Sequence, residues 1–150
     1  MATEPFRNMI VVVDGTESAV KAAEYAVALA CVLQLRLVAV SVVDTETLRR
    51  LMVLRILVEE ERRDFESDLE KSHRRHLDFV AHLARQANVP IETVLKKGIC
   101  HSIVLAERKE RQADLIIIGG FRSTHAKLDL VAHERRLIID EAPCPVLVVK

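Results

Sequence analysis

The chain has 150 residues, 50% of them hydrophobic, and its 22 lysine and arginine residues balance 22 aspartate and glutamate residues. A chain of this length can bury a sizeable core, so one domain over residues 1–150 is predicted. Zero net charge removes the positive field that attracts nucleic acid, and we expect no nucleic-acid partner. No basic segment followed by an apolar one opens the sequence, and no apolar run reaches about 18 residues, so a cytoplasmic protein with no membrane contact is expected.

The cysteines are the remaining compositional signal. Cys31, Cys100 and Cys144 are odd in number, widely spaced and form no CxxC pair. This usage is typical of reduced thiols that pack in the core of a protein in a reducing compartment. No disulfide is therefore predicted.

The first predicted strand covers residues 8–14, where "NMIVVVD" is a continuous β-branched run rather than an alternating one. Continuous runs are typical of parallel strands that are covered on both faces. Residues 15–34 then form a helix, with Thr16 or Ser18 as its N-cap. Apolar residues share the predicted inner face of this helix: Val20, Ala23, Val27, Ala30 and Cys31.

The chain continues as alternating strands and helices. Further strands are predicted at residues 36–44, 91–97, 114–120 and 144–150, and further helices at 100–113 and 128–140. This alternation implies right-handed crossovers between parallel strands. The predicted fold class is α/β, a single doubly wound open sheet of five parallel strands with helices on both faces.

The segment at residues 45–90 is predicted to be one long helix with a charged outer face. Glu59 precedes Arg63 by four residues and Glu70 precedes Arg74 by four, the favourable order for helical ion pairs. Apolar residues recur at helical spacing: Leu69, Leu77, Val80, Leu83, Ala84 and Ala87. The helix also carries His73, His76 and His82, which are expected on its solvated face because no further ligand completes a zinc site.

The front of that segment, "LRRLMVLRILV" from Leu48 to Val58, is apolar at eight of its eleven positions. Its arginines do not form a separate polar face. Two interpretations stay open: the sheet covers this stretch, or it is a docking surface for a partner protein.

A ligand site is expected beyond the carboxyl ends of the strands, where the strand order of an open α/β sheet reverses. Residues 13–18, 42–44 and 118–124 follow predicted strands and are polar or contain glycine. Gly119 and Gly120 could let the backbone approach a phosphate, or they could only turn the chain. No P-loop, GxGxxG, HExxH or GxSxG pattern occurs, so no catalytic residue and no metal ligand is predicted.

Three stretches together resemble the universal stress protein family. "MIVVVDGTESAVKAAEYAVALA" is similar to the family's opening, "KGICHSIVLAERKERQADLIIIGG" to its third-to-fourth-strand segment and "EAPCPVLVVK" to its ending. The resemblance covers nearly the whole chain apart from the middle helical region. It implies a single domain with strand order 3-2-1-4-5, usually a homodimer, in a family divided between members that bind ATP and members that do not.

The ATP-binding members carry a motif that this chain keeps only in part: Gly, two residues, Gly, nine residues, then Gly with Ser or Thr. Aligned from the "APCP" ending, Gly119 matches the first glycine, whereas Arg122, Ala132 and His133 replace the rest. A Cβ at position 122 disfavours positive φ, and position 133 lacks a hydroxyl donor. Glu134 adds negative charge near the expected phosphates. Tight ATP binding is therefore not expected.

The adenine side of the family's site is better preserved. Asp14 matches its acidic residue after strand one, and Val42 matches the residue whose backbone meets adenine, so Asp14, Val42 and Gly119 form a candidate, vestigial nucleotide site. Asp14 also fits a turn or a helix cap, and Val42 fits the core. Arg122 could itself pair with a phosphate. We expect no cofactor, with ATP as the alternative.

The last strand lies at a sheet edge under the implied order, so Val146 and Val148 could pair with a second copy. The leading hypothesis is a non-catalytic stress-response module without tight ATP binding, which acts as a homodimer through protein contacts. The alternative is an adenine-nucleotide-binding switch or slow ATPase that uses the degraded glycine loop.

Overall fold

The computed structural model describes residues 6–55, 58–121 and 129–150. Its centre is one sheet of five parallel strands in the order β3-β2-β1-β4-β5, which confirms the expected topology. The strands are β1 (Asn8–Val12), β2 (Arg36–Asp44), β3 (Ile91–Gly98), β4 (Leu115–Gly119) and β5 (Val146–Val149). Within the described ranges, no helix has the length and apolar character needed to cross a lipid bilayer.

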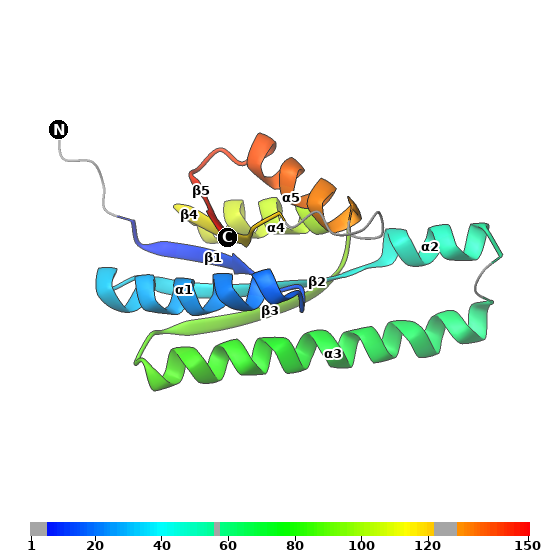
Figure 1. Ribbon diagram of the computed structural model, residues 1–150, viewed down its shortest axis with the longest axis horizontal. Coiled ribbons are helices and arrows are strands. Elements are labelled where there is room, and N and C mark those ends of the chain that lie inside the picture. The colour runs from blue at the N-terminus through cyan, green and yellow to red at the C-terminus, as the bar shows by residue number, and fades with distance from the viewer. Residues whose placement is uncertain (1–5, 56–57, 122–128) are drawn as a thin grey trace.

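Helices cover both faces of the sheet, as Figure 1 shows. Helices α1 (Glu17–Leu33) and α3 (Glu59–Gln86) lie on one face, and α4 (Cys100–Arg111) and α5 (Asp129–Glu141) lie on the other. Side chains of β1 alternate between the two layers, because neighbouring strand residues point to opposite faces. Met9 and Val11 join the core under α1 and α3, while Ile10 and Val12 join the core under α4 and α5.

Helix α1 begins at Glu17, and its N-cap is Thr16, one of the two predicted candidates; the Thr16 hydroxyl accepts the N–H of Ala19 over 3.2 Å. Its buried face consists largely of alanine, which lets the helix pack close to the strands: Ala19, Ala22, Ala23, Ala26, Val27 and Ala30. The predicted inclusion of Cys31 was wrong, because this thiol is exposed. Cys31 follows Ala30 by one residue and is therefore rotated about 100° away from the buried stripe.

The single long helix predicted over residues 45–90 was also wrong. The segment forms two helices, α2 (Thr45–Val53) and α3, and α2 is followed by Arg55 in the left-handed conformation with φ 58°. Strand β3 must begin at the same edge as β2, so the chain has to travel back along the sheet. Strand β2 spans about 30 Å and α3 about 42 Å. Both α2 and the start of α3 therefore project beyond the strands (Figure 1).

Each of the two interpretations of residues 48–58 holds for a different part of this stretch. Leu48 is buried against the body of the protein, with 2% of its surface exposed. Val53 and Leu54 are exposed at 71% and 67%, and Val58 is exposed as well. The body of the protein thus covers Leu48 and leaves Val53, Leu54 and Val58 in solvent, while residues 56 and 57 lie outside the described residues.

Candidate functional site

A cleft of about 330 Å³ opens at the carboxyl ends of β1 and β2, between the projecting helices and the layer formed by α4 and α5. This is the position at which open α/β sheets bind ligands. Asp14 and Val42 both line the cleft, so the structure brings these two predicted residues together. Gly119 does not belong to its lining.

Asp14 makes the turn contacts that the sequence allowed. Its Oδ1 accepts the Thr16 N–H over 3.0 Å and the Thr16 hydroxyl over 2.6 Å. Its Oδ2 accepts a bond of 2.8 Å from Nη2 of Arg135, a residue of α5. The carboxylate therefore shapes the turn before α1 and also neutralises a cation from the opposite layer.

Arg135 is the central residue of the site and was missed by sequence reasoning. Only 6% of it is exposed, and its guanidinium donates to groups on three separate segments. Nη1 donates to Ser18 Oγ over 3.0 Å and to the Gly120 carbonyl over 2.7 Å, and Nη2 also donates to Thr16 Oγ1 over 2.9 Å. The available signal was its helical spacing with Val131 and Ile138, which places an arginine on the inward face of α5.

Gly119 and Gly120 both have structural roles that require no ligand. A Cβ at Gly119 would lie 2.6 Å from Ser18 Oγ and 2.9 Å from the backbone nitrogen of Ala19, so glycine lets β4 end against the first turn of α1. Gly120 donates its N–H to the Val149 carbonyl over 2.7 Å and accepts from Arg135. At Gly119 the close backbone contact is with the first turn of α1, so the glycine is explained without a phosphate.

The remaining motif positions lie at the start of α5 or outside the described residues. Ala132 is half-buried and His133 is exposed on α5, whereas Arg122 lies outside the described residues. Glu134 lines the cleft and caps the neighbouring helix α4. Its Oε2 accepts the His101 backbone N–H over 2.8 Å and the His101 Nδ1–H over 2.6 Å.

The expectation of solvated histidines was wrong for His73 and His76. His73 Nδ1 lies 2.5 Å from Ser41 Oγ, and the Ser41 hydroxyl lies 2.6 Å from the Val13 carbonyl, which can only accept. Because the hydroxyl hydrogen goes to Val13, Nδ1 of His73 carries the proton and Nε2 is left as an acceptor. Burial, reinforced by nearby His76 and opposed by Asp14, holds the pKa of His73 below its ordinary value.

The Ser41–His73 pair has no geometry for nucleophilic catalysis. Ser41 is fully buried, and its hydroxyl is already committed to the Val13 carbonyl. His76 packs against Gly15, whose φ of +79° and lack of a Cβ leave room for the imidazole ring. The two histidines therefore belong to the packing between α3 and the ends of β1 and β2.

Cys100 also lines the cleft without offering a nucleophile. Burial, aided by the nearby Glu134 carboxylate, raises the pKa of its thiol to about 12, so it stays protonated near neutral pH. Burial likewise raises the pKa of Cys144, which packs on the α4–α5 core as expected for a structural thiol.

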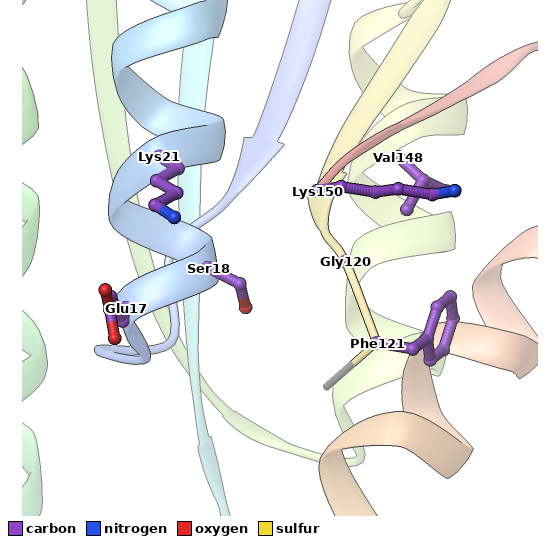
Figure 2. A pocket seen from close by; sticks show the side chains of 7 residues that line it. All are labelled: Glu17, Ser18, Lys21, Gly120, Phe121, Val148 and Lys150. Atoms are coloured by element: carbon purple, nitrogen blue, oxygen red, sulfur yellow. The ribbon is translucent and has the colours of Figure 1, made fainter. Parts of the chain in front are cut away.

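A smaller cavity of about 220 Å³ lies near the edge of the sheet, and Figure 2 shows its lining. Ser18 extends from α1 toward the chain at Gly120, while Phe121, Val148 and Lys150 lie on the other side. Arg136 stacks over the Phe121 ring with 5.6 Å from its guanidinium carbon to the ring centre. This cavity borders edge strand β5, so it adjoins the surface at which a second copy was expected.

The fold and the position of the cleft agree with comparisons to known proteins. The model of the universal stress protein family matches residues 5–150, and the chain belongs to this family. Universal stress protein MJ0531 of Methanocaldococcus jannaschii is 26% identical over 146 residues, which cover 97% of this chain and 82% of that protein.

Solved structures share the fold over nearly the whole chain. Universal stress protein UspA from Lactobacillus plantarum is 26% identical with a TM-score of 0.67, covering 99% of this chain and 100% of that one. A universal stress protein from Archaeoglobus fulgidus, solved in complex with dAMP, is 17% identical with a TM-score of 0.66, covering 98% of this chain and 100% of that one.

Proposed function

We propose that this universal stress protein is a non-catalytic stress-response module of the cytoplasm, which does not bind ATP tightly and acts as a homodimer through protein contacts. The observation that carries the proposal is the buried guanidinium of Arg135, bonded to Asp14, Thr16, Ser18 and the Gly120 carbonyl. The protein's own cation thus occupies the junction between the turn after β1, the start of α1 and the end of β4.

A triphosphate needs uncommitted N–H donors and positive charge at such a junction. Nη1 of Arg135 already donates to the Gly120 carbonyl, and Nη2 already donates to Asp14. Glu134 brings a carboxylate to the cleft, and Ala132 and His133 replace the glycine and the hydroxyl-bearing residue of the ATP motif. Each of these features disfavours phosphate binding.

Calorimetric titration with ATP and Mg²⁺ tests this proposal. We expect no binding with a Kd in the micromolar range, and such binding would contradict the proposal. Titration of dAMP into the Archaeoglobus fulgidus relative, whose complex with dAMP has been solved, serves as the positive control.

The alternative function is a nucleotide-dependent switch. It is supported by the dAMP complex of that relative and by Val42, which lines the cleft where the family resemblance expects adenine. Under this alternative, an adenine nucleotide such as ATP or AMP binds in the cleft, and slow ATP hydrolysis could follow. Titration of AMP beside ATP, with an assay of phosphate release from ATP, separates the two functions.

The homodimer part of the proposal rests on β5. This strand is at the edge of the sheet, and all four of its residues are only partly buried, including Val146 and Val148. Pairing with a second β5 would satisfy its outer backbone groups. Light scattering at micromolar concentration should give twice the monomer mass. Val148→Asp should give a monomer, and Val32→Asp, an exposed valine on α1, should not.

The protein-contact part rests on the projecting helices. Val53, the last residue of α2, and the following Leu54 expose large apolar side chains to solvent. Leu54→Glu should remove a binding partner in affinity capture while the melting temperature stays unchanged. Val32→Glu is the matched control, and equal partner loss from both variants would contradict this assignment.

A further inference from the structure

The cleft has the size and the surface of a small-molecule site. Its volume of about 330 Å³ falls at the lower end of the range of about 300–1,000 Å³ for ligand pockets. Most of its lining is apolar, including Val12, Val42, Leu48, Leu69, Val131 and Ile138. These side chains come from β1, β2, α2, α3 and α5, so a compact apolar body would be enclosed from several sides.

The polar groups of the cleft are mainly acceptors. His73 is neutral near pH 7, and its Nε2 has a lone pair because Ser41 holds the proton on Nδ1. Glu134 accepts both of its recorded bonds, from His101, on Oε2. A carboxylate accepts about four hydrogen bonds, so Glu134 keeps capacity for a donor from a ligand.

Among the residues that the structure describes around the cleft, the charges favour a cation. Arg135 and Asp14 neutralise each other at 2.8 Å, and that pair is largely withdrawn from solvent. Glu134 adds a further carboxylate to the lining. A phosphate or carboxylate ligand would therefore meet like charge, whereas an ammonium or amidinium group would meet opposite charge in a partly desolvated setting.

We propose that this cleft binds a small organic cation, an amine or amidine with an apolar body, rather than a phosphorylated ligand. The apolar body packs against Val42, Leu69 and Ile138, and the cationic head donates to Glu134 and to Nε2 of His73. The inference rests on the proposed function in one respect: both require that the cleft reject phosphate.

Three probes with one apolar body and different heads test the charge rule: 2-phenylethylamine, 2-phenylethanol and 3-phenylpropionate. Calorimetry or ligand-induced chemical-shift changes on the full chain measure each affinity. We expect the amine to bind at least roughly tenfold more tightly than the carboxylate, with the alcohol between them. Equal affinities, tighter binding of the carboxylate, or no binding of the amine would overturn the proposal.

Glu134→Gln tests the position of the cationic head, because glutamine keeps an oxygen that can accept from His101 and so retains the cap of α4. Amine affinity should fall roughly tenfold while alcohol affinity stays the same. Glu141→Gln, at an exposed position on the same helix, removes the same charge outside the cleft and should change neither. Equal effects of the two variants would overturn the assignment of Glu134.

Filling the cleft tests the position of the apolar body. Val131→Trp places a large ring in the lining and should abolish binding of amine and alcohol alike, whereas Ile139→Trp, at an exposed position on the same helix, should not. Amine binding that survives Val131→Trp would overturn the proposed location. ATP is titrated in parallel: micromolar ATP binding contradicts the proposed function, and absence of both ATP and amine binding contradicts the present inference alone.

Discussion

Arg135 donates from Nη2 to Oδ2 of Asp14 over 2.8 Å, and this bond joins residues that lie 121 positions apart in the chain. The same guanidinium donates to Ser18 of α1 and to the Gly120 carbonyl after β4. One side chain therefore connects α5 to three segments that meet at the carboxyl ends of the strands. Its loss is expected to affect both the stability and the ligand preference of the protein.

Replacing Arg135 by alanine should lower the free energy of unfolding by about 2–4 kcal/mol, because breaking a buried ion pair leaves Asp14 and the Gly120 carbonyl without their partner. Chemical denaturation with urea measures the change. Arg136→Ala is the matched control on the exposed face of α5, where the stacking on Phe121 contributes about 0.5–1 kcal/mol. Equal losses from the two variants would contradict the central position of Arg135.

A methyl group at Gly119 should be poorly tolerated, because its Cβ would lie 2.8 Å from the backbone carbon of Ser18. We expect Gly119→Ala to cost about 1–3 kcal/mol of unfolding free energy, as overpacking does. At Gly120 the nearest atom would be the Val149 carbonyl oxygen at 3.0 Å, so Gly120→Ala should cost less. Thermal denaturation of the two variants should give this order, and the reverse order would refute the packing role of Gly119.

Stability should fall on acidification partly because of His73. Its pKa in the folded state lies below the ordinary value of 6.5, so the unfolded chain takes up the proton first as the pH falls below about 6.5. His73→Asn keeps a donor for Ser41 and removes the titration. Its stability should therefore depend less on pH between about 7.5 and 5.5 than that of the wild type.

His82→Asn is the control for this measurement, since His82 is exposed on the same helix. Its curve of unfolding free energy against pH should follow the wild type. A His73 variant that loses as much stability as the wild type over this pH range would show that the histidine is not buried in its neutral form.

The three thiols should differ in reactivity. Cys31 is exposed, whereas the pKa of about 12 for Cys100 leaves roughly one thiolate in ten thousand at pH 8. Iodoacetamide should therefore alkylate Cys31 first, followed by Cys144 and last by Cys100, as mass spectrometry of the peptides would show. In urea the three rates should become similar, and faster labelling of Cys100 in the folded protein would disprove its burial.

Rebuilding the glycine motif should create ATP binding. The triple variant Arg122→Gly, Ala132→Gly and His133→Ser restores freedom of the backbone and a hydroxyl donor, and calorimetry should detect an affinity that the wild type lacks. The control variant Arg136→Gly and Asp140→Ser introduces glycine and serine at exposed positions of α5 outside the motif. It should bind no ATP. A triple variant that stays inactive would refute the argument from the loop.

Local patterns in the sequence were sufficient for the strands, the two-sided burial and the family. Continuous β-branched runs such as residues 9–13 are buried on both faces of the sheet. Because these runs alternate with helices along the chain, they predict a parallel sheet. The placement of Asp14 and Val42 in one cleft also followed, because the carboxyl ends of neighbouring parallel strands meet at one edge.

Local patterns were insufficient where the outcome depends on what packs opposite. The spacing of apolar residues over 45–90 indicates helix throughout. The length of the sheet nevertheless requires the chain to turn back, so the first helix ends and the chain turns near Arg55. His73 and His76 look solvated beside charged neighbours, yet they face Ser41 and Gly15, which are distant in sequence.

The amino-acid sequence by itself determined the α/β class, the strand order through its family and the weakness of the ATP motif, because these depend on residue types at fixed spacing. Only the tertiary structure decided that Arg135 occupies the junction of Asp14, Ser18 and Gly120. The reason is physical. An arginine on a helix is expected at the surface, and its charge can be buried only where the folded chain provides enough hydrogen-bond acceptors around it.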